Sequence, residues 1–385
     1  MKNKVILFTV NVDWFFLSHR LNLATEALKN GYEVHLAASF TDHKSHIESL
    51  GIHVHDLDIS RGSTSVLNVL LSIISIFKIV RLTSPDIIHA ITLKVSIISA
   101  IASVFHRRTG LIVAISGLGY MYTEKSFVNS IKKGIIYFFF QLLAMRSNLK
   151  LIFQNRYDMN ELTKSNKVLL NKATLIFGSG VDLEKYCPQT SSEIFPCKKV
   201  VFASRLLHTK GIDEFVSAIK IFNSHNTSQD LDVEFIIAGD FDDANPACIS
   251  RDAIESWSEI ENLKYIGHQN NLDELFLSSY IFVLPSYREG MPLVICQALA
   301  SGLPSITSNI PGCMDAVQDN KTGLLVPVRD PAALYKAMQK LLSDDALRQR
   351  MSLSARTFAV QNFNVVDITE QHMKLYSSAL FKQNS

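Results

Sequence analysis

Two segments of the sequence combine charged side chains with the expected start of a helix. The segment at 284–312 reads LPSYREGMPLVICQALASGLPSITSNIPG, and Pro292 is expected at the first helical position, where its missing N–H would lack an intrahelical partner anyway. The amides around a helix start, together with the helix dipole, form a site for an anion. Glu289 precedes this helix. An isolated loop carboxylate is usually solvated, but the nearby strand end, Gly290 and Pro292 favour a functional role.

The second segment, FASRLLHTKGIDEFV at 202–216, places two cations beside another helix start. Arg205 follows a strand and Lys210 precedes the helix. A guanidinium offers a planar fork of donors and an ammonium a mobile point charge, so the pair suits a diphosphate. By itself this segment is weak evidence, because the two cations could be ordinary solvated surface residues. Together with Glu289 they predict one site, because both segments would follow strand carboxyl ends of one parallel sheet.

These segments need a parallel sheet to position them, and the chain shows the pattern of such sheets throughout. Apolar runs alternate with helical patterns, which is typical of parallel strands covered on both faces. The pattern lapses into a polar, proline-containing stretch near 182–198 and then restarts, which predicts two α/β, Rossmann-like domains facing across a cleft. We expect strands at 4–10, 32–38, 52–58, 86–92, 110–116, 149–155 and 173–177, and then at 199–204, 233–239, 263–267, 280–286, 304–308 and 323–328.

Length and composition limit the possible functions. The 385 residues suit two domains, and 38 basic against 36 acidic residues, a net charge of +2, give no reason to expect a nucleic-acid partner. The five cysteines form no C-x-x-C pair and the histidines lack metal-ligand spacing, so we expect separate thiols in a reducing cytoplasm and no metal site. The short apolar run at 5–10 predicts a first strand rather than a secretory signal.

The motifs R-L-L-x-x-K-G at 205–211 and S-x-x-E-G-M-P-L-x-x-x-Q-A-x-A-S-G-L-P at 286–304 resemble those of retaining GT-B glycosyltransferases of bacterial surface-polysaccharide synthesis (glycosyltransferase family 4, group 1). The segments at 11–34, 115–123 and 237–248 are similar to the branch that adds hexosamines to undecaprenyl-diphosphate-linked sugars. The resemblance implies a hexosyltransferase that moves an N-acetylhexosamine from a UDP-sugar, with retention and without a metal or other cofactor. The acceptor would be a polyprenyl-diphosphate-linked saccharide in O-antigen (lipopolysaccharide), capsule or glycan assembly.

The resemblance also implies a donor site in a C-terminal nucleotide-sugar-binding domain at 190–361. The catalytic residues would be Arg205 and Lys210, which hold the diphosphate and stabilise the departing nucleotide, and Glu289, which contacts the sugar. Position 297 would hold the ribose, but Gln297 stands where the family has a second Glu. An amide has one acceptor oxygen where a carboxylate accepts from both hydroxyls. The expected donor-binding residues, with backbone amides from the first two, are Gly290, Met291, Pro292, Leu293, Gln297, Gly239 and His268.

The N-terminal domain at 1–182 is expected to bind the acceptor, with a C-terminal helix at about 362–385 packed back on it. Its first strand is not followed by G-x-G-x-x-G, which argues against a dehydrogenase. Capping and packing are an equal alternative for Asp13 and His19, and a strand histidine such as His89 is more often a core residue. The acceptor-side candidates are Asp13, His19, His89, Lys94, Ser116, Gly117 and Gly119.

The stretch KKGIIYFFFQLLAMR at 132–146 has an apolar core with basic residues at both ends. It suits either a buried helix or an interfacial one, with Lys132, Lys133 and Arg146 near anionic headgroups on the inner face of the plasma membrane. A lipid-linked acceptor favours the interfacial interpretation. Two other functions stay open: a nucleotide-sugar 2-epimerase of the same fold, and a non-catalytic subunit that binds nucleotide sugar or lipid, for which Gln297 is the only indication.

Overall fold

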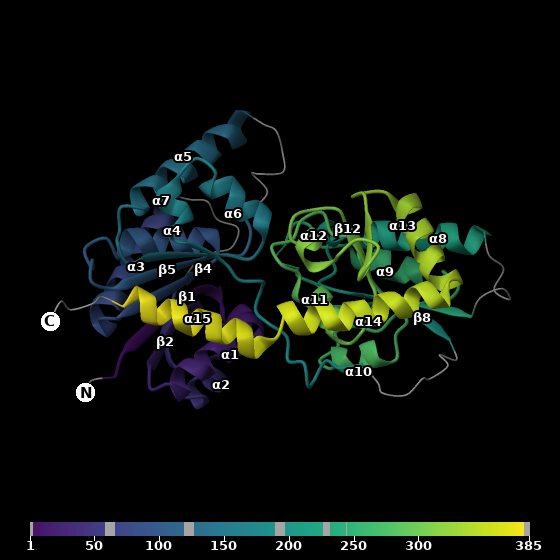
Figure 1. Cartoon of the computed structure of the whole chain (residues 1–385), viewed down its shortest axis with the longest axis horizontal. Helices are drawn as coiled ribbons and strands as arrows, with labels where there is room; N and C mark the ends of the chain where they lie inside the picture. The colour runs from purple at the N-terminus through teal and green to yellow at the C-terminus, as the bar shows by residue number, and fades with distance from the viewer. Residues whose placement is uncertain are drawn as a thin grey trace. The chain divides into compact units, whose positions relative to one another are not determined.

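The computed structural model divides the chain into two compact units (Figure 1). The first consists of Met1–Ser179 with Val366–Ser385, and the second of Gly180–Val365. The C-terminal segment therefore belongs to the same unit as the N-terminal half. The residues that the structure describes are 3–57, 66–118, 127–188, 197–225, 232–243 and 245–380.

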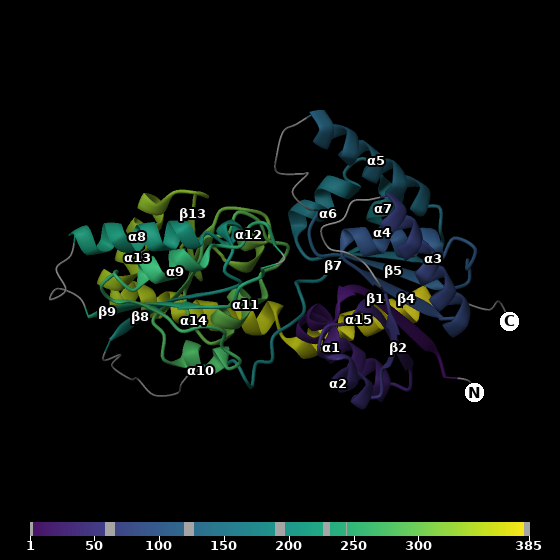
Figure 2. The same cartoon turned by 180° about the vertical axis from the view of Figure 1, so that it is seen from behind.

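The first unit is built on a seven-stranded parallel sheet with the order β3-β2-β1-β4-β5-β6-β7. Strand order reverses between β1 and β4, and sheets of this kind bind ligands outside the carboxyl ends of the strands at such a point. The strands are apolar because helices cover both faces of the sheet (Figures 1 and 2). They are β1 (Val5–Val12), β2 (Glu33–Ser39), β3 (His53–Asp56), β4 (Ile87–Ile91), β5 (Gly110–Ile115), β6 (Leu149–Phe153) and β7 (Ala173–Leu175).

Two apolar layers attach the helices to this sheet. One layer contains Phe16 of α1 and Tyr376 of α15, so the last helix completes the core of the first unit. The opposite layer contains Ile98 of α4 and Phe140 of α5. The helices of this unit are α1 (Asp13–Lys29), α2 (Lys44–Ser49), α3 (Val66–Thr83), α4 (Leu93–Ala102), α5 (Phe127–Leu143), α6 (Arg156–Thr163), α7 (Lys167–Leu170) and α15 (Val365–Ala379).

The second unit has a six-stranded parallel sheet with the order β10-β9-β8-β11-β12-β13, so its strand order reverses between β8 and β11. Phenylalanine rings fix α8 on the sheet: Phe215 stacks on Phe202 at a centroid distance of 5.5 Å, and Phe222 meets Phe235 at 5.3 Å. The strands are β8 (Lys198–Ala203), β9 (Val233–Ala238), β10 (Leu263–Tyr265), β11 (Ile281–Leu284), β12 (Ser305–Ser308) and β13 (Gly323–Val326).

The helices of the second unit connect these strands and cover the sheet. They are the 3-10 helix η2 (His208–Lys210), α8 (Ile212–His225), α9 (Arg251–Trp257), α10 (Leu272–Leu277), α11 (Leu293–Ala300), α12 (Cys313–Ala316), α13 (Pro331–Ser343) and α14 (Asp345–Asn362). Every strand expected from the sequence is present, with ends that differ by two residues at most. The prediction of two parallel α/β sheets is therefore confirmed.

Candidate functional site

The carboxyl ends of β8 and β11 bring Lys210 and Glu289 together. The Nζ atom of Lys210 lies 2.5 Å from Oε1 of Glu289, and the exposed fractions of the two side chains are 18% and 11%. The hydroxyl of Ser286 donates to the same carboxylate oxygen over 2.8 Å. The structure thus joins the two charged sequence segments at one edge of the second sheet, in a largely enclosed ion pair.

Close backbone contact between the two loops holds this pair in place. The amide of Tyr287, after β11, donates to the carbonyl of Thr209, after β8, over 2.9 Å. Gly211 ends η2 with a φ of 76°, and a Cβ atom there would overlap the carbonyl of Pro285. Because only glycine satisfies both constraints, the K-G dipeptide positions the ammonium of Lys210 beside the β11 loop.

Arg205 leaves the end of β8 and pairs with a residue that the sequence analysis missed. Its NH1 atom lies 2.5 Å from Oδ2 of Asp242, in the loop after β9. The Arg205 side chain is 43% exposed, so a ligand can reach the guanidinium. The acidic run at 240–243 is the sequence signal for this partner, but the run does not show which carboxylate turns towards the arginine.

Helix α11 starts one residue later than the sequence analysis expected. Pro292 is extended, with a ψ of 102°, and caps the helix: its carbonyl accepts from the amides of Ile295 and Cys296. Leu293 is the first helical residue. The prediction of Pro292 at the first helical position is wrong, because the chain is still extended as it leaves the loop. The amides of Leu293 and Val294, which precede the first of these bonds, have no acceptor within the helix, so the anion site described from the sequence keeps its physical basis.

The other donor-side candidates lie on the same edge of the sheet. Met291 is buried beside Pro292, Gly290 is half-buried, and Gln297 is half-buried on α11. Gly239 follows β9 with a φ of 153°, and a Cβ atom there would overlap the carbonyl of Ser204. Gly239 therefore allows the loops after β8 and β9 to touch. His268 follows β10 and is exposed.

In the first unit, Asp13 follows β1, and its buried carboxylate holds the loop after β2 by hydrogen bonds. Its Oδ2 accepts from the amides of Thr41 and His43 over 2.8 and 3.3 Å, and its Oδ1 accepts from the Thr41 hydroxyl over 3.0 Å. The packing alternative describes this carboxylate, since the loop after β2 occupies both oxygens. His19 is half-buried and stacks on Phe15 at a centroid distance of 4.3 Å.

His89 is a core residue and cannot contact an acceptor in this structure. Its side chain is fully buried, and Nδ1 forms a hydrogen bond of 2.7 Å with the hydroxyl of Tyr376 on α15. Burial holds the pKa of His89 well below the ordinary value, and the charge of Arg20 and the nearby His372 add to the effect. The imidazole is therefore a neutral link between β4 and α15.

The remaining acceptor-side candidates follow β4 and β5. Lys94 is half-buried at the start of α4, and burial lowers the pKa of its ammonium. Thr92 before it has a φ of 73°, a strained conformation that is concentrated at functional sites. Ser116 and Gly117 follow β5 and are half-buried, with a φ of 150° at Gly117. Gly119 lies outside the described residues.

Two family models match the sequence, one in each unit. "Glycosyl transferase 4-like" matches residues 5–159, and "Glycosyl transferases group 1" matches residues 196–358, which include Arg205, Lys210 and Glu289. The chain belongs to the group 1 glycosyltransferases. The resemblance stated from the motifs and the predicted enzyme class are therefore confirmed.

Related proteins cover most of this glycosyltransferase. It is 24% identical over 359 residues to the N,N'-diacetylbacillosaminyl-diphospho-undecaprenol alpha-1,3-N-acetylgalactosaminyltransferase of Campylobacter jejuni, which covers 90% of this chain and 92% of that protein. It is 28% identical over 318 residues to the UDP-Gal:alpha-D-GlcNAc-diphosphoundecaprenol alpha-1,3-galactosyltransferase of Escherichia coli, over 79% and 78% of the two chains. The fold is similar to the crystal structure of Anabaena HepE in complex with UDP and glucose, with a TM-score of 0.75 and 18% sequence identity; the match covers 98% of this chain and 100% of HepE. The shared fold is GT-B.

The apolar stretch of this glycosyltransferase at 132–146 has two different faces. Ile136 and Phe140 of α5 are buried against the sheet, whereas apolar residues on the other face are exposed: Ile131, Ile135, Phe138, Leu142 and Met145. The buried-helix interpretation therefore describes one face, and the exposed apolar face leaves the interfacial interpretation open. Among the described residues, no helix is both long and apolar enough to cross a bilayer.

Arg146, at the end of this stretch, has a different role from the expected one. Its guanidinium donates to the backbone carbonyls of Ser103, His106 and Thr109, so it fixes the loop after α4. The expectation of a headgroup contact for Arg146 is wrong, because these carbonyls occupy its donors. Lys132 is exposed and stays available for that role.

One group of side chains in the described part of the glycosyltransferase could hold a metal ion. Glu33, His35 and His53 bring one ligand atom each to within 4.8 Å of the others. They lie at the amino ends of β2 and β3, on the edge of the first sheet opposite to the acceptor-side candidates. The spacing of these residues along the chain had predicted no metal site, since the group forms only when the two strands pair.

Proposed function

We propose that this glycosyltransferase moves an N-acetylhexosamine from a UDP-sugar, with retention, onto a polyprenyl-diphosphate-linked saccharide during surface-polysaccharide assembly. The Lys210–Glu289 pair carries the proposal, because it places a cation and a carboxylate at the strand ends where a nucleotide sugar would bind. The C. jejuni and E. coli relatives, named for transfer to diphospho-undecaprenol saccharides, support the acceptor class. HepE, crystallised with UDP, supports the nucleotide.

Without a donor, Glu289 neutralises Lys210. A bound diphosphate competes for the ammonium, since it carries more negative charge than one carboxylate, and the released Glu289 can accept hydrogen bonds from hydroxyls of the sugar. Arg205 offers its exposed guanidinium to the same diphosphate. As the sugar leaves, charge develops on the nucleotide, and the two cations with the amides of Gly290 and Met291 are placed to stabilise it. These groups supply the charge stabilisation, so the proposal includes no metal.

The rest of the donor is assigned to side chains on the same sheet edge. Gln297 on α11 is assigned to the ribose, where its amide accepts from one hydroxyl and donates to the other. Leu293 and His268 are assigned to the surface around the nucleotide. In the first unit, Lys94, Ser116 and Gly117 are the candidates for the acceptor, and Lys94 suits its diphosphate.

Purified protein incubated with separate UDP- and GDP-sugars and extracted polyprenyl-diphosphate-linked saccharides tests this function. Mass spectrometry of the lipid fraction should show one added N-acetylhexosamine with a UDP donor and none with a GDP donor. Free sugar or an epimerised nucleotide sugar in the absence of lipid would instead identify a 2-epimerase. Tight donor binding without turnover on any acceptor would identify a non-catalytic subunit, and either result would contradict the proposal.

The first unit carries an exposed apolar surface that supports peripheral binding to the inner face of the plasma membrane. The side chains of Ile135 and Phe138 on α5 are each 63% exposed, and Phe105 and Met145 are each 84% exposed. The hydrogen bonds of Arg146 join the loops that carry Phe105 and Met145. The helices that pack on the same face of the sheet, and the loop after α4, also carry exposed basic residues: Lys78, Arg81, Arg107, Arg108 and Lys132. Apolar side chains beside basic ones are typical of a protein that lies on an anionic membrane.

The double variant Ile135→Glu/Phe138→Glu is expected to bind anionic vesicles about 10²- to 10⁴-fold more weakly, since burial of each such side chain contributes about 1.5–3 kcal/mol and about 1.4 kcal/mol is a tenfold change in affinity. Lys132→Glu should have a smaller effect that high salt removes. Sedimentation with phosphatidylglycerol vesicles measures both. Leu353→Glu is the control, because Leu353 on α14 is an exposed apolar residue of the second unit, 74% exposed, and lies outside this surface. Equal sedimentation of all variants would contradict membrane binding through α5.

A further inference from the structure

Three histidines and a glutamate share one face of the strand pair at the edge of the first sheet. The register pairs His35 of β2 with His53 of β3, and Ala37 with His55. Paired residues and residues two apart along a strand point to the same face. Glu33, His35, His53 and His55 therefore project from one side, although β2 and β3 are separate along the chain.

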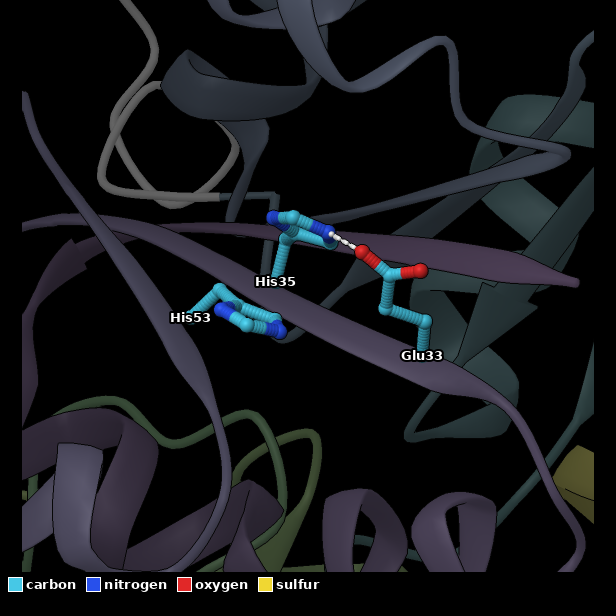
Figure 3. A group of neighbouring side chains, drawn as sticks. All are labelled: Glu33, His35 and His53. Carbon is cyan, nitrogen blue, oxygen red and sulfur yellow. Dashed lines mark hydrogen bonds and ion pairs between the residues drawn. The ribbon is translucent and has the colours of Figure 1, made fainter. Parts of the chain in front are cut away.

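The contacts within this group converge on His35. Its Nε2 atom lies 2.9 Å from Oε1 of Glu33, and its Nδ1 atom lies 2.9 Å from Nε2 of His55. Figure 3 shows the Glu33 carboxylate directed at the His35 ring, with the His53 ring beside it from the neighbouring strand. The His35 side chain is only 10% exposed, whereas Glu33 is 41% exposed and His53 lies at the surface. The position of His35 is thus fixed by packing, whereas the more exposed side chains of Glu33 and His53 have room to rotate.

The hydrogen bond to His55 is the kind that orients a metal-binding imidazole. A histidine that binds a metal through Nε2 carries its proton on Nδ1 and usually donates it to a second group. Here that group is Nε2 of His55, 2.9 Å away.

We propose that Glu33, His35 and His53 bind one divalent transition-metal ion, with Zn²⁺ as the best match. Two imidazoles and a carboxylate suit Zn²⁺, whereas Mg²⁺ prefers oxygen ligands alone. Ligand atoms around a tetrahedral ion lie about 3.4 Å apart. In the structure the three ligand atoms lie within 4.8 Å of one another, so small rotations of the Glu33 and His53 side chains would bring them to this spacing. A fourth position is open to water.

The ion would join β3, one of the two edge strands of the sheet, to β2. An edge strand is held by one neighbour only, so a bond across this pair would stabilise β3. The site lies at the amino ends of the strands, and the proposed acceptor residues lie at the carboxyl ends. Binding of the ion is therefore a separate property of the protein, and the proposed sugar transfer does not depend on it.

Isothermal titration of the full-length chain, freed of any affinity tag and treated with EDTA, tests the proposal. We expect one Zn²⁺ per chain and a Zn²⁺-dependent rise in Tm, with no response to Mg²⁺. His53→Ala should abolish binding and Glu33→Gln should weaken it, whereas His55→Ala should weaken it about 10- to 100-fold. His46→Ala is the control, because His46 on α2 is an exposed histidine of the same unit outside the group.

A spectroscopic measurement separates this site from unspecific surface binding. Cu²⁺ bound to the wild-type chain should show nitrogen hyperfine splitting from two imidazoles by electron paramagnetic resonance, and the splitting should be lost in His53→Ala. If His53→Ala does not fold, the loss of Zn²⁺ affinity in Glu33→Gln is measured by titration instead, since this change keeps both imidazoles and the size of the side chain and removes only the charge. A wild-type chain without Zn²⁺ binding, or variants that bind as well as wild type, would overturn the proposal.

Discussion

Replacing Glu289 by Gln is expected to lower the rate of sugar transfer by about 10²- to 10⁴-fold, the range found when a positioned group that acts in the transition state is removed. The amide keeps the size of the side chain and can still accept from Ser286, so the loop after β11 should keep its conformation. What is lost is the charge that faces the sugar as positive character develops near its anomeric carbon. We therefore expect a large fall in kcat and a donor KM that is unchanged or lower, because the diphosphate no longer competes with the Glu289 charge for Lys210.

Lys210→Met should affect binding as well as turnover, because the ammonium is assigned to the diphosphate in both the bound donor and the departing nucleotide. Both kcat and donor affinity are expected to fall. In this variant Glu289 also loses the partner of a mostly enclosed ion pair, and removal of one partner of such a pair costs about 3–5 kcal/mol of stability. Unfolding must therefore be measured beside activity.

Two further variants keep this test decisive. The double variant Lys210→Met/Glu289→Leu removes both charges, so it should recover most of the lost stability while transfer stays abolished. Lys264→Ala removes an exposed lysine that pairs with Glu234 within β9 and β10 of the same unit, and it should leave activity unchanged. Full activity in Glu289→Gln, or in the double variant, would rule out this site for the donor.

The strands could be located from the sequence because parallel strands covered on both faces are continuous apolar runs. Ile87–Ile91 and Ile281–Leu284 are fully buried and lie between polar turns, so the runs and their boundaries coincide. The carboxyl ends of such strands lie on one edge of the sheet. This topology alone is sufficient to predict that Lys210 and Glu289 lie close together.

The sequence does not decide the role of residues whose partners come from a distant part of the chain. A carboxylate after a strand, such as Asp13, has the same local pattern whether it binds a ligand or clamps a loop, and the clamped loop follows β2. Arg146 has the position of a membrane anchor, but the carbonyls that bind it follow α4. The group of Glu33, His35 and His53 depends on the β2–β3 register, and a slip of one residue would turn His53 to the other face.

The second large effect is a loss of stability at acidic pH, caused by two buried, neutral histidines: His372 on α15 and His89 on β4, beneath that helix. Burial lowers the pKa of His372 to about 3, with a further contribution from the charge of Arg20, and the pKa of His89 is also well below its ordinary value. Arg20 is itself buried, and among the described residues its Nε and NH2 atoms have no hydrogen-bond partner. A proton on either imidazole would add a second uncompensated charge to this layer.

The direction in which stability changes with pH follows from the number of protons bound by the folded and the unfolded states. In the unfolded chain these histidines take up protons near pH 6.5, whereas His372 in the folded chain stays neutral down to a pKa of about 3. Between these values the unfolded state binds more protons, so stability falls as the pH falls. At about pH 5 the loss from His372 alone is on the order of 2 kcal/mol relative to neutral pH, and His89 adds to it in the same direction.

His372→Met is expected to remove about one proton from this pH dependence and to make the protein more stable than wild type at about pH 5. Urea unfolding at pH values between about 5 and 7.5 measures the slope. Methionine suits the site because the Nδ1–H of His372 donates only to the Ile368 carbonyl of its own helix, and Nε2 has no partner in the described part of the chain. His46→Ala is the matched control, an exposed histidine that should leave the slope unchanged. If His372→Met and wild type lose stability equally on acidification, the buried histidines are not the cause of the loss.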